Sequence, residues 1–522
     1  MKKKYIYVAL FAVLLGSATS CDKDFEDINT NKLLPTNLDA NYLLTQAQIG
    51  KASVTTFRYE GSIVQQVNTA LSGVLEGGNR NTAIENNINP PFNEIYLNSV
   101  RQLVQIIEQT KDKPELSNVR NLARIWKAYD YMTLVDTYGS VPYFDAARGF
   151  LDSNFRPEYD DDDAIYEDLI KELEDASKSL NATTGGRITG DLVYAGDVVK
   201  NQRFANSLLL RAGMRYTKVN PTKAAEIVKR ALAAPSGVIT NINNSDDAFI
   251  RYNTTFINPT SSVMQGNERS NYYAGKAFID YLQSNNDPRL RHIAVKYEKP
   301  AQPLNAVGAK NTNPAEQIGM PFGFDETTIV TAPGFPGRAG AEYRYSQFNR
   351  ETVLRNDAPE FLVTAAQTNL LLAEAAVRGF ITGAPDMVAA KTYYENGIRA
   401  HMNQLRLFDA SATITPEQQN AYIMQSSILF DPTKAIQQIN EQYWVASFRI
   451  WNEAWANFRR TGFPQLNPIN FPFEDPSVKG AFIRKLPLPL RETQINADAY
   501  KAALGFMGGT DNLATRVFWD KQ

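Results

Sequence analysis

Apolar side chains recur at helical spacing along much of this chain, and that spacing limits the folds open to it. The clearest stripe lies behind four consecutive acids and is formed by Ile165, Leu169, Leu173, Ala176 and Leu180. An acidic start followed by such a stripe is typical of an amphipathic helix. The same spacing is found at residues 96–107, 122–132, 362–377 and 394–405. We therefore predict a largely helical protein.

The predicted helices come in neighbouring pairs joined by short breaks at 111–114 and 379–385. Alanine and glycine at close-contact positions favour hairpins stacked as in tetratricopeptide repeats, although the pairs follow no strict repeat length. Strand-like alternation is confined to short pieces such as 141–143. The predicted fold class is all-α, with tetratricopeptide-like hairpins that form an α-α superhelix.

The helical pattern lapses between about residues 237 and 359, where Asn, Gly, Pro and Tyr become frequent. A shorter stretch of this kind covers residues 73–91. Irregular segments this long are uncommon inside a compact domain unless they have a function. Because a rigid scaffold commonly holds binding loops, we predict an irregular ligand-binding half packed against the hairpins.

The N-terminus has the order of a secretory signal: three lysines, an apolar stretch and then small residues before Cys21. The apolar stretch is shorter than the ~20 residues that span a bilayer as a helix. Cys21 is the only cysteine of the chain. The sequence Ala18-Thr19-Ser20-Cys21 resembles a bacterial lipobox, which predicts a signal peptide at 1–20, a lipid on Cys21 and a tether over 21–40. The alternative is ordinary cleavage that leaves a soluble periplasmic protein with a free thiol.

Composition and motifs argue against several classes of function. The 54 basic and 56 acidic residues nearly cancel, so a nucleic-acid partner is not expected. With two histidines and no Gly-x-Ser-x-Gly motif, acyl-transfer chemistry lacks a nucleophile and a base, and zinc binding is unsupported. A calcium loop at 160–163 stays open, although helix capping also explains these acids. We expect no catalytic residue, no metal and no cofactor.

Several longer sequence motifs are spread along the chain, most of them on predicted helices. They are the run from Trp126 to the Tyr-Gly-x-x-Pro-Tyr turn at 138–143, the helix 361–379 with Leu-Leu-Ala-Glu-Ala-Ala at 371–376, Tyr393-Tyr394-x-x-Gly397-Ile398, the run from Glu453 to Pro464, the run 484–500, and the ending Arg516-Val517-Phe518-Trp519-Asp520. Together they resemble the SusD/RagB family of nutrient-binding outer-membrane lipoproteins of Bacteroidetes.

This resemblance implies one SusD-like domain over 41–522, with a loop-rich insert at about 237–359. It also implies a lipid-anchored, cell-surface protein of the outer membrane that captures a glycan and passes it to a SusC-like TonB-dependent transporter. The acidic run 22–27 resembles the signal that exports such lipoproteins to the cell surface. Some family members carry peptides, and this alternative stays open, as does a surface glycoside hydrolase with a carboxylate pair.

A sugar-binding surface needs flat apolar rings together with amide and guanidinium groups that pair with hydroxyls. Three clusters in the irregular stretches offer this mixture, with Asn86, Asn87 and Tyr343 beside the main candidates. The predicted ligand-binding residues are Arg80, Asn81, Tyr252, Asn253, Asn271, Tyr272, Tyr273, Arg344, Tyr345 and Phe348. The alternative for each is that it pins a long loop to the scaffold.

Other conspicuous residues are predicted to be structural. His401 lies on the apolar stripe of its helix, where a packed and hydrogen-bonded histidine is expected. Four tryptophans have apolar neighbours in predicted helices and are assigned to the core: Trp126, Trp444, Trp451 and Trp455. The segment 459–462 could be read as an anion site, but as a family signature at a helix end we expect it to be structural.

Overall fold

The computed structural model describes residues 38–52 and 56–521. The predicted signal peptide, the lipidation site Cys21 and most of the predicted tether lie outside these residues. In the part of the chain that is described, no helix combines the length and the apolar character needed to cross a membrane.

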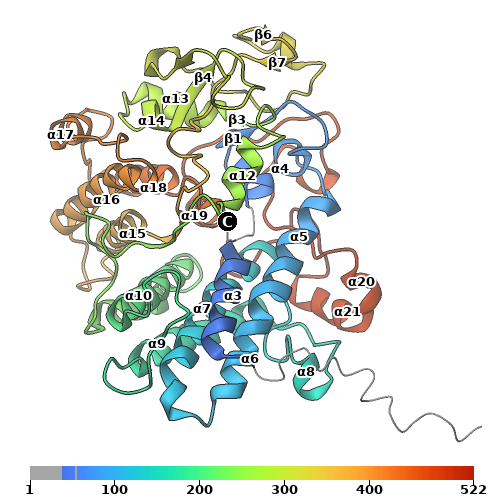
Figure 1. The fold of residues 1–522 in the computed structure, drawn as a ribbon, viewed down its shortest axis with the longest axis vertical. Helices are drawn as coiled ribbons and strands as arrows, with labels where there is room; N and C mark the ends of the chain where they lie inside the picture. The colour runs from blue at the N-terminus through green and yellow to red at the C-terminus, as the bar shows by residue number, and fades with distance from the viewer. Residues whose placement is uncertain (1–37, 53–55, 522) are drawn as a thin grey trace, which may run out of the picture.

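Eleven helices form what we call the helical half, which occupies the lower and left parts of Figure 1. They are α3 (Ala40–Ala52), α5 (Glu85–Ile95), α6 (Arg101–Thr110), α7 (Ser117–Tyr138), α9 (Asp162–Ser179), α10 (Val198–Arg215), α11 (Pro221–Ala233), α15 (Ala365–Val377), α16 (Met387–Phe408), α18 (Ala435–Ala446) and α19 (Trp451–Thr461). Shorter helices flank them: α8 (Gly149–Asp152), α17 (Pro416–Ile423), α20 (Glu492–Ile495) and α21 (Ala497–Phe506).

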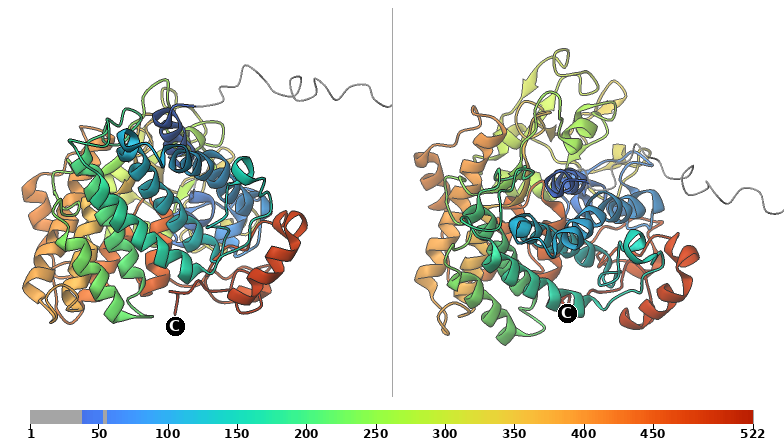
Figure 2. Two further views of the ribbon diagram at one scale, coloured as in Figure 1. Left: turned by 90° about the horizontal axis from the view of Figure 1, so that it is seen from below. Right: turned by 60° about the horizontal axis from the view of Figure 1, so that its bottom comes forward.

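Neighbouring helices of this half pack side by side in a continuous series. Helix α6 contacts α7, α7 contacts α9, α9 contacts α10, and α10 contacts both α11 and α15. Helix α15 then packs on α16 and α18, and α19 returns to contact α7. The two views of Figure 2 show these helices stacked one after another along the molecule. The predicted all-α fold class with tetratricopeptide-like hairpins is confirmed.

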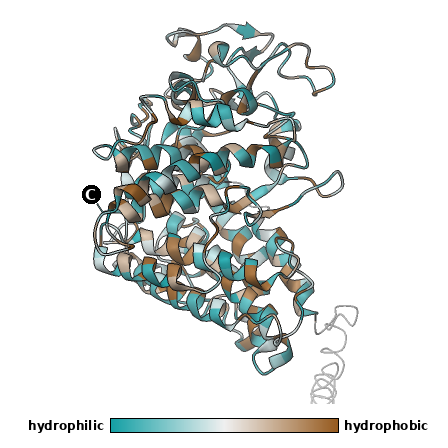
Figure 3. Cartoon of the chain, turned by 90° about the vertical axis from the view of Figure 1, so that its left-hand side faces the viewer, coloured by the Kyte–Doolittle hydropathy of each residue, from teal (hydrophilic) through white to brown (hydrophobic). Residues whose placement is uncertain are grey.

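The helices form because one stripe of each can be buried. In Figure 3 hydrophobic and hydrophilic positions alternate along the helices of the lower part. The main apolar core is one connected cluster of residues that come from along the chain, from Ala40 to Trp519. It contains the four tryptophans that were assigned to the core. Burial of apolar surface at this scale is the largest favourable contribution to the stability of such a fold.

Two further predictions of structural roles are confirmed. His401 is buried on α16, and its Nδ1 lies 2.9 Å from Nη1 of Arg289. The buried guanidinium of Arg460 donates to both oxygens of Glu374, at 2.7 and 2.6 Å. Arg459 is buried beside it, and its Nη1 donates to the carbonyl oxygen of Arg484 at 2.6 Å.

Helix capping was predicted to explain the acids at the start of α9, but the side chain of the N-cap residue Asp161 accepts no hydrogen bond from a backbone amide of the helix. The acids instead tie α9 to other segments. Asp160 accepts from the amides of Tyr143 and Phe144, and Asp162 accepts from that of Phe518 at 2.8 Å. The carboxylates are therefore used in tertiary contacts.

What we call the loop-rich half consists of segments 62–84, 237–359 and 464–481, most of which lie in the upper part of Figure 1. Its short helices are α4 (Glu76–Arg80), α12 (Pro259–Gln265), α13 (Lys276–Ser284) and α14 (Leu290–Ile293). Its antiparallel strands form small sheets. β1 (Val67–Asn68) pairs with β3 (Tyr273–Ala274), β4 (Ala294–Tyr297) lies between β5 (Lys310–Asn311) and β8 (Gln347–Phe348), and β6 (Arg338–Ala339) pairs with β7 (Glu342–Tyr343). β2 (Ala248–Ile250) pairs with β9 (Glu360–Val363), which directly follows the segment 237–359. Single π-helical or 3₁₀ turns lie at Phe57–Gly61, Tyr96–Val100, Pro114–Leu116, Pro314–Glu316, Ile329–Thr331 and Pro476–Val478.

Two local predictions need correction. The helix predicted to start at Phe361 starts at Ala365, because Glu360–Val363 forms β9 and pairs with β2. The strand-like piece at 141–143 makes only an isolated bridge, between Val141 and Asp160. In both places a pairing partner distant in the sequence decides the backbone conformation.

Candidate ligand-binding surface of the loop-rich half

The structure gathers several of the predicted ligand-binding residues around a second, smaller apolar core. Tyr273, Tyr343 and Tyr345 meet there, with the ring of Tyr273 lying 5.9 Å from that of Tyr343 and 6.4 Å from that of Tyr345. The backbone amide of Tyr343 donates to the hydroxyl of Tyr273 at 3.2 Å. These rings are buried and hold the 318–345 loops in place. Arg344, between two of them, is exposed and donates from Nε to the carbonyl of Arg338.

Other predicted aromatic residues belong to the main core. Tyr272 directly precedes β3 and belongs to the main core, where its ring packs edge-on against Phe57 at 5.1 Å. Its hydroxyl donates to Glu268. Phe348 is buried 5.2 Å from the ring of Phe448. The structure therefore does not place Tyr272 and Phe348 beside Tyr345.

Arg80 and Asn81 lie at the end of α4, where three loops meet. Nη1 of Arg80 donates to Glu76 at 2.7 Å, and Nη2 donates to the carbonyl of Ala70 at 2.9 Å. Asn81 adopts a left-handed conformation with φ 54°, and its Nδ2 bonds Glu474 at 3.2 Å. Both residues are buried, so they fix the loops and also form the floor of their meeting point. Asn86 and Asn87 lie apart from them, in the first turn of α5.

The surface over this floor contains residues that were not predicted as ligand-binding. Ser72 donates from Oγ to Glu326 at 2.8 Å, and Arg80 stacks over the ring of Phe471 at 5.0 Å. Phe473 lies 6.1 Å from Phe471 and is 80% exposed. We call this surface, formed by Ser72, Arg80, Glu326, Phe471 and Phe473, the Arg80 face. The signal that could have revealed it is the irregular run Asn467 to Phe473, which mixes Asn, Pro and Phe.

The Arg80 guanidinium is paired with two carboxylates, those of Glu76 and Glu326. Nη2 of Arg80 lies 3.6 Å from Glu326. Partial burial alone would raise the pKa of Glu326, but hydrogen bonds from backbone and Ser72, with the charge of Arg80, lower it below the usual range. The carboxylate therefore stays ionised at neutral pH and can accept hydrogen bonds. An exposed ring beside ionised and hydroxyl groups is the mixture that a saccharide requires.

Tyr252 and Asn253 lie elsewhere, on the loop that leads to α12. Tyr252 stacks on Phe256 with centroids 4.6 Å apart, and Asn253 accepts from the amides of Thr255 and Phe256 at 2.8 Å. The hydroxyls of Tyr252 and Tyr345 are buried and find no partner within the described residues. Asn271 is half-buried, and its amide donates to the carbonyl of Glu268.

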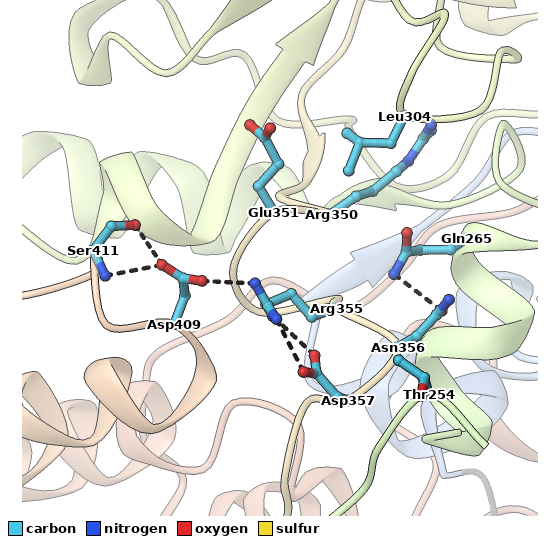
Figure 4. A pocket seen from close by; sticks show the side chains of 10 residues that line it. All are labelled: Thr254, Gln265, Leu304, Arg350, Glu351, Arg355, Asn356, Asp357, Asp409 and Ser411. Carbon is cyan, nitrogen blue, oxygen red and sulfur yellow. Dashed lines mark hydrogen bonds and ion pairs between the residues drawn. The ribbon is translucent and has the colours of Figure 1, made fainter. Parts of the chain in front are cut away.

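A cleft of about 650 Å³ opens beside this loop, between the loop-rich half and the segment that follows α16. Figure 4 shows Arg355 in its middle, between the carboxylates of Asp357 and Asp409. Its Nε and Nη2 bind Asp357 at 2.8 and 2.9 Å, and its Nη1 binds Asp409 at 2.8 Å. Arg350 and Leu304 lie near each other on another wall. The volume lies within the usual range for small-molecule sites.

Neither surface has the geometry of a metal centre. In the described part of the chain, no group of three or more His, Cys, Asp and Glu side chains is arranged to hold a metal ion. His292 and His401 both have a lowered pKa, caused by burial together with a neighbouring arginine, Arg291 or Arg289. Both imidazoles are therefore neutral at pH 7.

Residues 31–479 match the model of a SusD-like family described as starch-binding and associating with the outer membrane. The match covers most of the 522-residue chain. The chain belongs to the SusD-like family. The family that the sequence motifs indicated is therefore confirmed. A comparison with curated proteins gives no match.

Solved structures of SusD-like proteins share the fold. A chitin-binding protein is 28% identical, with a TM-score of 0.78 over 93% of this chain and 100% of its own. A SusD-like protein from Bacteroidetes AC2a is 25% identical, with a TM-score of 0.79 over the same shares. A chitin-binding SusD homologue from Flavobacterium johnsoniae is 21% identical, with a TM-score of 0.75 over 92% of this chain and 98% of its own. Two of these three proteins are described as chitin-binding.

Proposed function

We propose that this SusD-like protein captures a glycan at the Arg80 face and passes it to a SusC-like TonB-dependent transporter of the outer membrane. The observation that carries the proposal is the exposed ring of Phe473 beside the fixed polar groups of Ser72, Arg80 and Glu326. The ring offers a flat apolar platform for the C–H face of a sugar, and the polar groups pair with hydroxyls. No catalytic step is part of the proposal.

The fixed loops favour this assignment. The small core of Tyr273, Tyr343 and Tyr345 holds the 318–345 segment, and Arg80 links α4 to the carbonyl of Ala70. A surface whose loops are already ordered loses less conformational freedom when it binds. The names of the chitin-binding relatives point to chito-oligosaccharides as the first ligands to test.

The test is calorimetry of the mature protein with chito-oligosaccharides, malto-oligosaccharides and short peptides. Phe473→Ala should weaken glycan binding about tenfold, because it removes a stacking platform. Phe150→Ala is the matched control, since Phe150 is 84% exposed on α8, in the helical half. Equal binding by wild type and Phe473→Ala would move the site away from the Arg80 face, and heat from peptides alone would favour peptide transport.

Anchoring and transfer form the second part of the proposal. A lipid on Cys21 and a tether over 21–40 would keep the protein at the cell surface beside its transporter, because attachment through more than one acyl chain is stable. Mass spectrometry of the mature N-terminus should show a lipidated Cys21. Copurification from outer membranes should recover a barrel protein. A free thiol at Cys21, or recovery of no barrel, would contradict this part.

A further inference from the structure

Arg350 is a buried cation held by neutral oxygens and by the ring of Tyr297, whose centroid lies 4.5 Å from its guanidinium. It is 2% exposed, and its guanidinium donates to the carbonyls of Gln302, Arg269 and Pro300 and to the side-chain oxygen of Gln347. Within the described residues it forms no salt bridge. Burying a charge without a counter-ion is unfavourable, so this arrangement needs a reason.

Most other buried arginines of the described chain have acidic partners. Six of them form salt bridges: Arg80 with Glu76, Arg211 and Arg215 with Glu453, Arg289 with Asp287, Arg449 with Glu360, and Arg460 with Glu374. The seventh, Arg459, also donates only to carbonyls, those of Trp455, Arg484 and Asp136. Arg350 differs from the first six, each of which has a carboxylate at salt-bridge distance.

A second arginine lies close to Arg350. Arg269 is half-buried, and it donates from Nε and Nη1 to the carbonyls of Gln265 and Ala301. Burial, together with the charge of Arg269, lowers the pKa of Arg350. It remains far above neutrality because a guanidinium does not lose its proton in proteins. Two positive charges thus lie together without a carboxylate between them.

Arg350 lies at the wall of the cleft described above, together with Gln265, whose carbonyl accepts from Arg269. At the other side of the cleft, Arg355 lies between two carboxylates, Asp357 and Asp409, which leave that side with a net negative charge. Glu351 is paired with Lys310 and does not pair with Arg350. The cleft is therefore polarised, with the positive charge of Arg350 on one wall and a negative charge at the other.

We propose that this cleft is a second binding site, for a saccharide unit that carries a carboxylate or a sulfate group, with Arg350 as the partner of the anion. The anion would give Arg350 the acidic partner that it lacks among the described residues. The Arg355–Asp357–Asp409 array and the amide of Asn356 would meet sugar hydroxyls, and Leu304 would contact an apolar face of the ring. About 650 Å³ is enough for a short oligosaccharide.

The site is separate from the Arg80 face and does not depend on it. The experiment titrates the full mature protein with an oligogalacturonate, a sulfated chondroitin oligosaccharide, a neutral chito-oligosaccharide and a peptide with a free C-terminal carboxylate. We expect heat from one or both anionic saccharides, and affinity that falls as NaCl is raised. The two anionic ligands separate a carboxylate site from a sulfate site.

Two substitutions test the role of Arg350. Arg350→Gln should weaken binding of the anionic saccharide about tenfold, because it removes a charge-assisted contact. Because Arg350→Gln could disturb the loop, Leu304→Glu provides a second variant that keeps Arg350 and supplies a competing carboxylate beside it. Both variants should leave binding of the neutral glycan unchanged, and Phe473→Ala should leave binding of the anionic saccharide unchanged.

The matched control is Arg291→Gln, which removes one positive charge from an exposed arginine on α14. It should change anion binding by less than about twofold. The proposal is overturned if neither anionic saccharide binds, if the peptide alone binds, or if Leu304→Glu binds the anionic saccharide as tightly as wild type.

Discussion

Two buried arginines of the helical half and one of the loop-rich half have different partners. In the helical half, Arg215 on α10 is bonded to Asp136 on α7 and Glu453 on α19, and Arg460 is bonded to Glu374. In the loop-rich half, Arg350 is surrounded by neutral oxygens and by the ring of Tyr297. Paired charges fix three helices in one relative position. The carbonyl groups around Arg350 order its loop but do not neutralise the guanidinium, so its charge remains available to a ligand.

The largest effect should follow from breaking a matched pair in the helical half. Glu374→Ala leaves Arg460 as an uncompensated buried charge and should lower the free energy of unfolding by about 3–5 kcal/mol in urea. Glu395→Ala is the control, because its pair with Lys391 on the surface of α16 is 3.9 Å long and such pairs contribute at most about 1 kcal/mol. Equal losses in the two variants would remove the distinction between buried and surface pairs.

The same pair also predicts a pH dependence. Burial alone would raise the pKa of Glu374, but the charge of Arg460 lowers it to about 2. Since the pKa is lower in the folded state, the stabilisation is complete above about pH 4.5 and is lost as the pH falls towards 2. The difference in stability between wild type and Glu374→Ala should therefore shrink over this window. A difference that stays constant would contradict an ionised Glu374.

A smaller effect is expected at a buried carboxyl without a matched cation. Burial raises the pKa of Asp130 on α7 to about 7. Stability is then fully present below about pH 4 and is lost as the pH rises to about 7. Asp130→Asn does not ionise, so relative to wild type it should gain about 2–3 kcal/mol between pH 5 and pH 8. Parallel pH profiles of the two proteins would show that Asp130 is already ionised at pH 5.

Local capping in the helical half should contribute less. The Asp386 side chain accepts hydrogen bonds from the amides of Val388 and Ala389, at 3.1 and 2.9 Å, at the start of α16. Asp386→Ala should lower the free energy of unfolding by about 1 kcal/mol. Asp386→Asn keeps the acceptor and should restore most of that loss. A variant as stable as wild type would mean that α16 is held by tertiary packing alone.

The smallest effect is expected in the loop-rich half, from the loss of a hydroxyl. Tyr345→Phe removes a buried hydroxyl without a partner in the described chain, so its stability should change by less than about 0.5 kcal/mol. Tyr443→Phe makes the same change in the helical half, where the hydroxyl donates to Glu453 at 2.7 Å, and should cost about 1.5–3 kcal/mol. Similar values would show that the two halves satisfy their buried polar groups alike.

Sequence reasoning predicted the helices well because their signal is local. The stripe from Ile165 to Leu180 became α9, and the break at 379–385 separates α15 from α16. It misplaced the start of α15 because β9 depends on β2, a strand far away in the chain. The binding residues were harder to predict, since an aromatic residue in a loop gives the same pattern whether it is buried like Tyr273 or exposed like Phe473.

By itself the sequence determined the fold class, the core tryptophans and the family, because apolar spacing and the Glu453 to Pro464 motif are readable along one stretch of chain. Only the tertiary structure decided which loops meet at the Arg80 face and that Arg350 has no carboxylate at salt-bridge distance among the described residues. Segments near residues 72, 326 and 473 come together through packing. Charge balance depends on distances in space, and the order of residues along the chain does not supply them.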